Sequence, residues 1–157
     1  MSAINDRLAS LGITLPALST PSANYIPVAR TGNLLYVSGQ VPVENGTVKY
    51  TGKLGADVSV EDGQAAARLC AINIIAHLSA ALDGDLGKVA RCVRLGGFVN
   101  ATPDFPDPPK VINGASDLIV EVFGEAGRHA RAAVGCATLP RNVAVEVDAI
   151  FEVVDGA

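Results

Sequence analysis

The sequence contains no tryptophan, and aromatic residues make up only 4% of its 157 residues. Proteins that bind single-stranded nucleic acids stack the bases on aromatic side chains, so this chain has few platforms for such a partner. Positive charge is not in excess either, since 12 Lys and Arg residues against 16 Asp and Glu residues give a formal net charge of −4. Nucleic acid is therefore disfavoured as a partner, although a local basic pocket is compatible with this composition.

Residues of the kinds that bind transition metals are few. The three cysteines, Cys70, Cys92 and Cys136, lie in separate apolar stretches, and no CxxC pair occurs. Neither His77 nor His129 lies at ligand spacing from a cysteine. We therefore expect buried, reduced thiols, no metal site and no histidine-based catalytic triad.

Long hydrophobic runs are absent as well. No stretch approaches the roughly eighteen apolar residues that a membrane-spanning helix requires. Residues 1–18 also lack the basic stretch followed by an apolar core that is typical of a secretory signal. These features predict a cytoplasmic protein without a membrane partner.

The length of the chain suits one domain with its own hydrophobic core. Hydrophobic residues make up 49% of the chain and charged residues only 18%, which is a low charge content for a surface fully exposed to water. Small apolar residues supply much of this count, so the composition favours close backbone packing. Part of the surface is expected to lie between subunits.

Hydrophobic periodicity and turn residues predict strands and helices along the whole chain. A cluster of prolines over 103–109 indicates a rigid loop before the second long helix. The predicted elements are, in chain order, a short helix over 4–11, strands over 25–30, 34–37 and 47–50, a helix over 60–82, a strand over 89–100, a helix over 110–124, and two strands joined by a turn at 139–142. This order is typical of a two-layer α+β domain in which both long helices cover one face of a mixed sheet.

Two prolines, Pro16 and Pro21, favour an extended lead after the short helix. We therefore interpret residues 1–21 as an N-terminal arm and residues 22–157 as a single domain. In such a domain the sheet face away from the helices still needs a covering partner.

One arginine and one glutamate interrupt the small apolar residues of the last two predicted strands. Residues 132–137 carry no charged side chain, so the Arg131 guanidinium needs a partner or a ligand carboxylate, which it can bind in a bidentate manner. Beyond the turn, Glu146 and Asp148 lie on one strand face, and an antiparallel hairpin could bring Glu146 near Arg131. The same pattern also fits a solvated arginine and an acidic outer strand face, so both interpretations stay open.

Two segments of the chain contain distinctive motifs. The first is Gly32–Pro42, with the sequence GNLLYVSGQVP, and the second runs from Arg131 through Pro140 to Glu146. Both segments resemble motifs of the RidA (YjgF) family of enamine and imine deaminases. The two segments lie about ninety residues apart, and the resemblance covers residues 22–154 in matching order. It implies a chorismate mutase-like fold and a homotrimer whose sheets close into a central barrel, with active clefts between subunits.

The resemblance also implies a reaction, the hydrolysis of a reactive 2-aminoacrylate-type enamine or its imine tautomer to a 2-keto acid and ammonia, with no cofactor and no metal. Arg131 corresponds to the residue that clamps the substrate carboxylate, and Glu146 to the acid that positions water or exchanges its proton. Tyr25 matches a tyrosine ahead of the first strand, Gly39 a glycine whose backbone borders the pocket, and Asn113 an asparagine of the second long helix. A small imine, enamine or carboxylate is the expected ligand.

The chain departs from many members of the family at two positions. Ala133 stands in place of a common cysteine, and Gly135 in place of a larger residue, which puts the substrate range in question. Two alternative functions remain, namely a catalytically silent trimer that binds small carboxylates or metabolites, and the endoribonuclease or translation-inhibitor activity attached to relatives. The lack of a histidine pair suited to phosphodiester cleavage argues against a ribonuclease.

Overall fold

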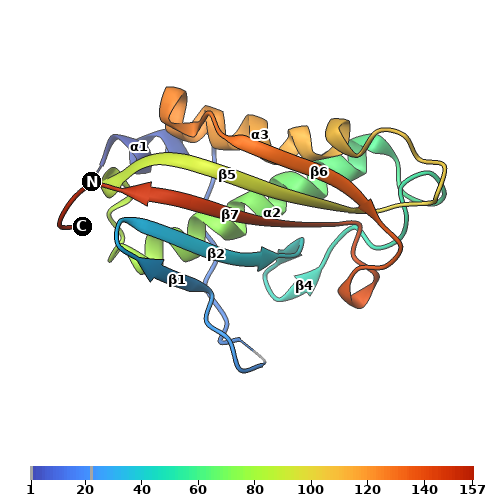
Figure 1. Ribbon diagram of the computed structural model, residues 1–157, viewed down its shortest axis with the longest axis horizontal. Coiled ribbons are helices and arrows are strands. Elements are labelled where there is room, and N and C mark those ends of the chain that lie inside the picture. The colour runs from blue at the N-terminus through green and yellow to red at the C-terminus, as the bar shows by residue number, and fades with distance from the viewer. Residues whose placement is uncertain (1, 22) are drawn as a thin grey trace.

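A five-stranded mixed sheet with two long helices on one face forms the body of the protein (Figure 1). This is the arrangement in a computed structural model, which describes residues 2–21 and 23–157. The helices are α1 (Ala3–Ser10), α2 (Val60–Ala81) and α3 (Pro108–Phe123), and the short 3-10 turns are η1 (Leu86–Lys88), η2 (Gly124–Gly127) and η3 (Pro140–Asn142). The strands are β1 (Val28–Thr31), β2 (Leu34–Gln40), β3 (Val43–Glu44), β4 (Thr47–Val48), β5 (Val89–Asn100), β6 (Ala130–Cys136) and β7 (Val145–Val153). The predicted two-layer α+β fold is confirmed.

The strand order separates the last two strands of the chain. The large sheet has the order β1-β2-β7-β5-β6, in which β5 and β6 run parallel and the other neighbours run antiparallel. β3 and β4 form a separate two-stranded sheet. The expected hairpin between the last two strands is therefore wrong, because β5 lies between them. Parallel strands need a long crossover, which α3 supplies between β5 and β6, and β7 then pairs with the other edge of β5.

Single residues of the sequence explain where α2 begins and how closely α2 and α3 pack. At the start of α2, the Ser59 hydroxyl accepts a hydrogen bond from the backbone N–H of Asp62 and so caps the helix. Where α2 and α3 lie against each other, a Cβ atom at Gly114 would overlap the backbone carbonyl group of Gln64. A glycine is required where two helix backbones come this close.

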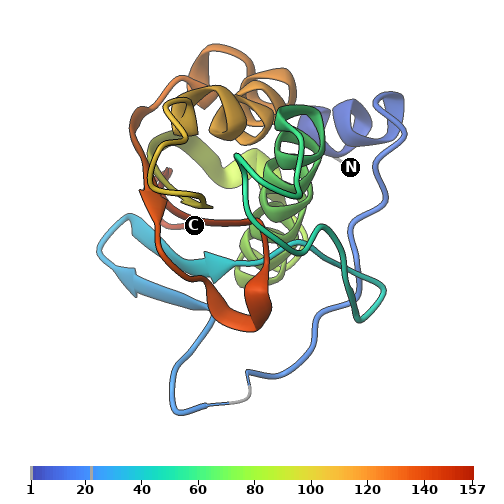
Figure 2. The same ribbon diagram turned by 90° about the vertical axis from the view of Figure 1, so that its right-hand side faces the viewer.

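Helices cover one face of the sheet but not the other. Figure 2, a view from one end of the molecule, shows both long helices on the same side of the sheet. Along β7, alternate side chains from Val145 to Val153 are buried on that side. The opposite side, which we name the open face, bears Tyr36, Glu146 and Asp148, and Tyr36 is 44% exposed. The core therefore lies between the helices and one sheet face, and residues 2–21 and 23–157 leave the open face uncovered in a single chain.

The N-terminal segment packs on the same body. α1 lies against α3 and η1, and its Leu8 is buried in the core. The Arg7 guanidinium donates a hydrogen bond of 3.1 Å to the Glu121 carbonyl oxygen. The strand predicted over 25–30 begins later, at Val28. None of the helices in the described part of the chain is long and apolar enough to cross a membrane.

Candidate active site

Arg131 lies on β6, the edge strand of the sheet, and its side chain points toward α3. Its Nη1 donates hydrogen bonds to Asn113 Oδ1 at 2.8 Å and to Ser116 Oγ at 3.2 Å. Because β6 is an edge strand, the arginine is only half-buried, and its partners are neutral groups rather than Glu146. Within the described residues, Nη2 and Nε make no hydrogen bond, so this edge of the guanidinium is available for a carboxylate.

His129 and Ser116 extend this contact into a network that the sequence-based prediction did not include. His129 Nδ1 lies 2.6 Å from the Gly127 carbonyl oxygen, which can only accept, so Nδ1 carries the proton. In the neutral ring Nε2 is then an acceptor, and the Ser116 hydroxyl, 2.9 Å away, donates to it. The spacing of His129 and Arg131 could have indicated this contact, because His129 directly precedes β6 and lies two residues before Arg131, the spacing at which residues of an extended chain share a face.

Glu146 lies on β7, and its side chain on the open face contacts Gly39 of β2. A Cβ atom at Gly39 would overlap Glu146 Oε1, so only glycine lets the carboxylate approach the backbone of β2 at this point. The register between β2 and β7 shifts between Val37 and Gln40, which places Gly39 in an irregular part of the strand. The fold therefore brings two of the predicted site residues, Gly39 and Glu146, into contact.

Two carboxyl groups of the open face, those of Glu146 and Asp148, hold protons more strongly than usual. Burial raises the pKa of Glu146 above its ordinary value, and the negative charge of Asp148 raises it further. Burial also raises the pKa of Asp148, whereas Arg94, with Nη1 3.5 Å from Asp148 Oδ1, opposes the rise. A raised carboxyl pKa suits a group that gives and takes protons in a reaction.

Tyr25 lies ahead of β1 and is 54% exposed. Together with Gly39 and Arg141 it lines a cavity of about 530 Å³, and the segment Pro16–Pro21 forms one wall of that cavity. The N-terminal segment therefore lines the same cavity as Gly39.

The predicted site residues form two groups on opposite sides of the sheet. Arg131 and Asn113 are hydrogen-bonded on the side that carries the helices. Gly39 contacts Glu146 on the open face and shares a cavity with Tyr25. Because β5 also separates β6 from β7, one chain does not bring Arg131 and Glu146 together.

The three thiols differ in burial. Cys70 and Cys92 are buried as predicted, and burial raises the pKa of both thiols, that of Cys92 to about 12. Cys136 is only half-buried, because it lies at the end of the edge strand β6. Buried thiols of raised pKa do not act as nucleophiles near neutral pH. Within residues 2–21 and 23–157, no group of three His, Cys, Asp or Glu side chains is arranged to hold a metal ion.

Comparison with known proteins identifies the family. Residues 5–153 match the family model described as "YjgF/chorismate_mutase-like, putative endoribonuclease". The chain belongs to this YjgF-like family. The resemblance inferred from the two motifs is confirmed, and so is the chorismate mutase-like fold.

Relatives of this YjgF-like chain include proteins with and without a named activity. "Protein TCP17" of Trypanosoma cruzi is 52% identical over 146 residues, which make up 92% of this chain and 91% of that protein. A 2-iminobutanoate/2-iminopropanoate deaminase of Dermatophagoides farinae is 25% identical over 138 residues, 88% of this chain and 92% of that protein. The crystal structure of Atu1372 from Agrobacterium tumefaciens, a protein of unknown function, is 55% identical, covers 96% of this chain and 92% of its own, and has a TM-score of 0.90. Further similar structures are named as endoribonucleases or translation initiation inhibitors.

Proposed function

We propose that the protein hydrolyses reactive imines that carry a carboxylate, and their enamine tautomers, to 2-keto acids and ammonia. The observation that carries this proposal is the free edge of the Arg131 guanidinium, which can bind the substrate carboxylate while Nη1 is held by α3. Membership of the YjgF-like family and the similarity to the Dermatophagoides farinae deaminase support the same reaction class.

The reaction needs a group that moves protons between water and the leaving nitrogen. The Glu146 carboxylate takes a proton from water as the water oxygen bonds to the C=N carbon, and passes it to the nitrogen. A second proton, from the new hydroxyl group, reaches the nitrogen by the same route, so that ammonia leaves as the C–N bond breaks and the C=O bond forms. The raised pKa of Glu146 keeps both protonation states accessible. An enamine is first protonated on carbon, which yields the same imine.

A site that contains both groups needs two subunits, because Arg131 and Glu146 lie on opposite sides of the sheet in one chain. We propose a homotrimer in which Arg131 of one subunit faces Tyr25, Gly39 and Glu146 of the next. The uncovered open face and the low charge content, 18% of residues, support burial of surface in such an assembly.

Release of 2-keto acid tests the proposed reaction. The wild type, Arg131→Ala or Arg128→Ala is added to an amino-acid oxidase that generates imines in situ. Semicarbazide then traps the imine that has not been hydrolysed. We expect Arg131→Ala to lose about 100-fold in kcat/KM, since hydrogen bonds between charged groups contribute up to about 3 kcal/mol. Arg128→Ala is the matched control and should keep wild-type activity, because Arg128 forms only an exposed pair with Glu125, at 3.1 Å. Equal imine loss with and without the wild type, across several amino-acid precursors, would rule out the deaminase.

Binding of small carboxylates without turnover is the second candidate. The separation of Glu146 from Arg131 within one chain favours it, because Arg131 alone can bind a carboxylate. This function predicts calorimetric binding of a 2-keto acid that disappears in Arg131→Ala, together with no effect of the wild type on imine loss.

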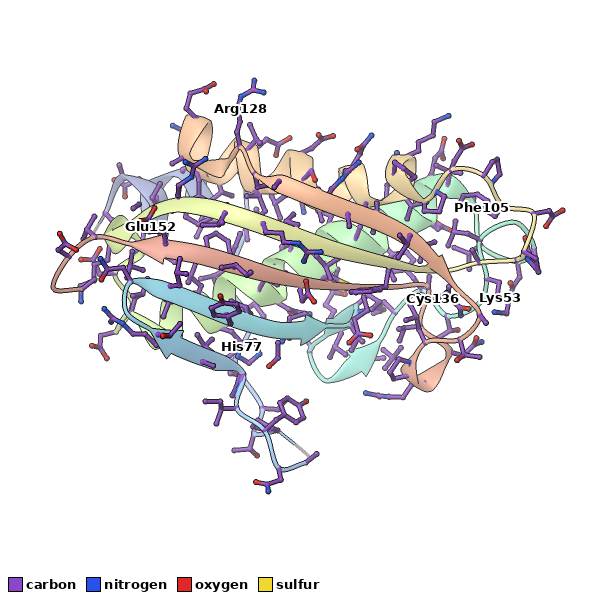
Figure 3. All side chains as sticks on the ribbon, viewed as in Figure 1. Lys53, His77, Phe105, Arg128, Cys136 and Glu152 are labelled. Carbon is purple, nitrogen blue, oxygen red and sulfur yellow. The ribbon has the colours of Figure 1, made fainter. Side chains whose placement is uncertain are left out.

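The names of related proteins also suggest a ribonuclease or an inhibitor of translation initiation. The net charge of −4 gives no general attraction for RNA. Gly127 and Ser116 hold the ring of His129, and Figure 3 shows His77 on the opposite side of the molecule from Arg128, the neighbour of His129. The two histidines therefore do not form a pair for phosphodiester cleavage, and we rank this function last.

A further inference from the structure

A second cavity, of about 600 Å³, lies where the parallel strands β5 and β6 end. Six of its lining residues carry the argument, namely Lys53, Thr102, Phe105, Pro108, Gly135 and Cys136. Figure 3 shows Lys53, Phe105 and Cys136 together at this end of the molecule. The volume is in the range of small-molecule sites, and the carboxyl ends of parallel strands commonly hold ligands.

This cavity is separate from the Arg131 site. Gly135 follows Arg131 by four residues on the same strand, which corresponds to about 13 Å. Neither Arg131 nor Asn113 lines the cavity. An imine derived from a common amino acid is too short to bridge this distance, so the two sites would bind different molecules.

Lys53 brings a positive charge to the cavity without a balancing carboxylate. Its Nζ donates hydrogen bonds to Asn100 Oδ1, at 2.7 Å, and to the Ala137 carbonyl oxygen. Both partners are neutral oxygens, and among the described residues no carboxylate oxygen lies within the 4.0 Å of an ion pair. The nearby Asp57 carboxylate instead accepts the backbone N–H of Lys53, at 2.7 Å. Since an ammonium group has three donors, one remains for a ligand anion.

The rest of the wall is rigid and largely apolar. Phe105, from the segment between β5 and α3, and Pro108, the first residue of α3, contribute apolar surface. The backbone N–H of Thr102 donates to the Leu54 carbonyl oxygen at 3.0 Å, which holds this wall against the loop that carries Lys53. The buried Thr102 Oγ1 has no hydrogen-bond partner within the described residues. A ligand with an apolar body and a polar end matches this surface.

Gly135 keeps the cavity open. A Cβ atom there would lie 3.7 Å from Ala101 Cβ and 3.9 Å from Pro108 Cγ, which are ordinary contacts. A larger side chain would therefore be compatible with the fold but would extend into the cavity. The absence of a side chain at this position leaves space for a ligand.

We propose that this cavity binds a small organic carboxylate with a compact apolar body. The carboxylate pairs with Lys53 Nζ, and the apolar body lies against Phe105 and Pro108. The proposal does not depend on the deaminase function, because it involves neither Arg131 nor Glu146.

Cys136 lines the cavity and serves as its reporter, since Cys70 and Cys92 are fully buried. Iodoacetate carries a carboxylate and iodoacetamide is neutral, so the ratio of their alkylation rates at Cys136, measured by peptide mass spectrometry, reports preference for an anion. The reference is the same ratio at Cys136 in protein unfolded in urea. We expect the folded ratio to exceed the reference about tenfold, the factor that corresponds to one charge-assisted hydrogen bond, and the iodoacetate rate to saturate with concentration.

Lys53→Gln should return the ratio to the reference value, whereas Lys49→Gln, which removes only an exposed pair with Glu44, should leave it unchanged. Gly135→Val should slow both reagents by filling the cavity, and phenylacetate should protect Cys136 in the wild type. These two measurements do not require Lys53 to be changed, so they keep the test valid if Lys53→Gln does not fold. A wild-type ratio equal to the reference, or an increase that Arg131→Ala abolishes, would overturn the proposal.

Discussion

The two edges of the Arg131 guanidinium have different roles, one bound to the protein and the other proposed to bind the substrate. Nη1 is held by Asn113 and Ser116, and Ser116 is held in turn by His129. Neither Ser116 nor His129 bonds to the Nη2 and Nε edge that would receive a carboxylate. We therefore infer that these two residues act through Arg131, as positioning residues.

Removal of this support should weaken substrate binding more than it slows the chemical step. For Ser116→Ala we expect KM to rise about three- to tenfold, because one hydrogen bond contributes roughly 0.5–1.5 kcal/mol, with kcat changed by less than about twofold. Ser116→Thr keeps the hydroxyl group and should restore the wild-type KM. Steady-state kinetics in the coupled oxidase assay measure both constants, and a lower kcat at unchanged KM would contradict a positioning role.

Glu146 should make the folded chain less stable as the pH rises. Its raised pKa means that the folded chain keeps a proton at pH values where the unfolded chain has lost it. Between the ordinary and the raised pKa, the free energy of unfolding therefore falls with increasing pH, and above the raised pKa this loss is complete. Relative to the wild type, Glu146→Gln should gain about 1–2 °C in Tm at pH 7 and almost nothing at pH 4, a small effect because the side chain is only half-buried. Thermal unfolding followed by circular dichroism would contradict this if the gain were larger at pH 4.

At the scale of elements, β5 decides which predicted residues meet. It pairs with β6 on one edge and with β7 on the other, so the strands that carry Arg131 and Glu146 are not neighbours. Local periodicity gives the faces of each strand but contains no information on the order of strands in a sheet. This is why the face shared by Glu146 and Asp148 could be predicted while the hairpin was wrong.

The contact between α2 and α3 depends on Gly114. Alanine there would force a methyl group into the Gln64 backbone, so we expect Gly114→Ala to lower the free energy of unfolding by about 1–3 kcal/mol. Gly135→Ala is the matched control, since its Cβ atom would meet no atom closer than 3.7 Å. Urea unfolding of both variants measures the difference. Equal stability of the two would show that the helices adjust their separation at little cost.

At the scale of the whole molecule, the proposed active site requires assembly of subunits, because its two groups of residues lie on opposite sides of the sheet in one chain. If Arg131 and Glu146 come from different subunits, a mixture of Arg131→Ala and Glu146→Gln chains, refolded together, contains interfaces in which both native residues meet. We expect each variant alone to be strongly impaired, as stated above for Arg131→Ala, and the mixture to recover a substantial part of the wild-type rate. Sedimentation should give a mass about three times that of the 16.1-kDa chain. A monomeric mass, or no recovery on mixing, would contradict the shared site.

The sequence by itself determined the helices, most of the strands, the two-layer class and the family, because these follow from local periodicity and from two short motifs. It also indicated Arg131, Asn113, Gly39 and Glu146 as candidates, yet it suggested that a hairpin could bring Arg131 and Glu146 together. Only the tertiary structure decided that they lie on opposite sides of the sheet, that Ser116 and His129 support Arg131, and that Lys53 borders a second cavity. The physical reason is that periodicity along the chain specifies which face a side chain takes, whereas its partners depend on packing between segments far apart in the sequence.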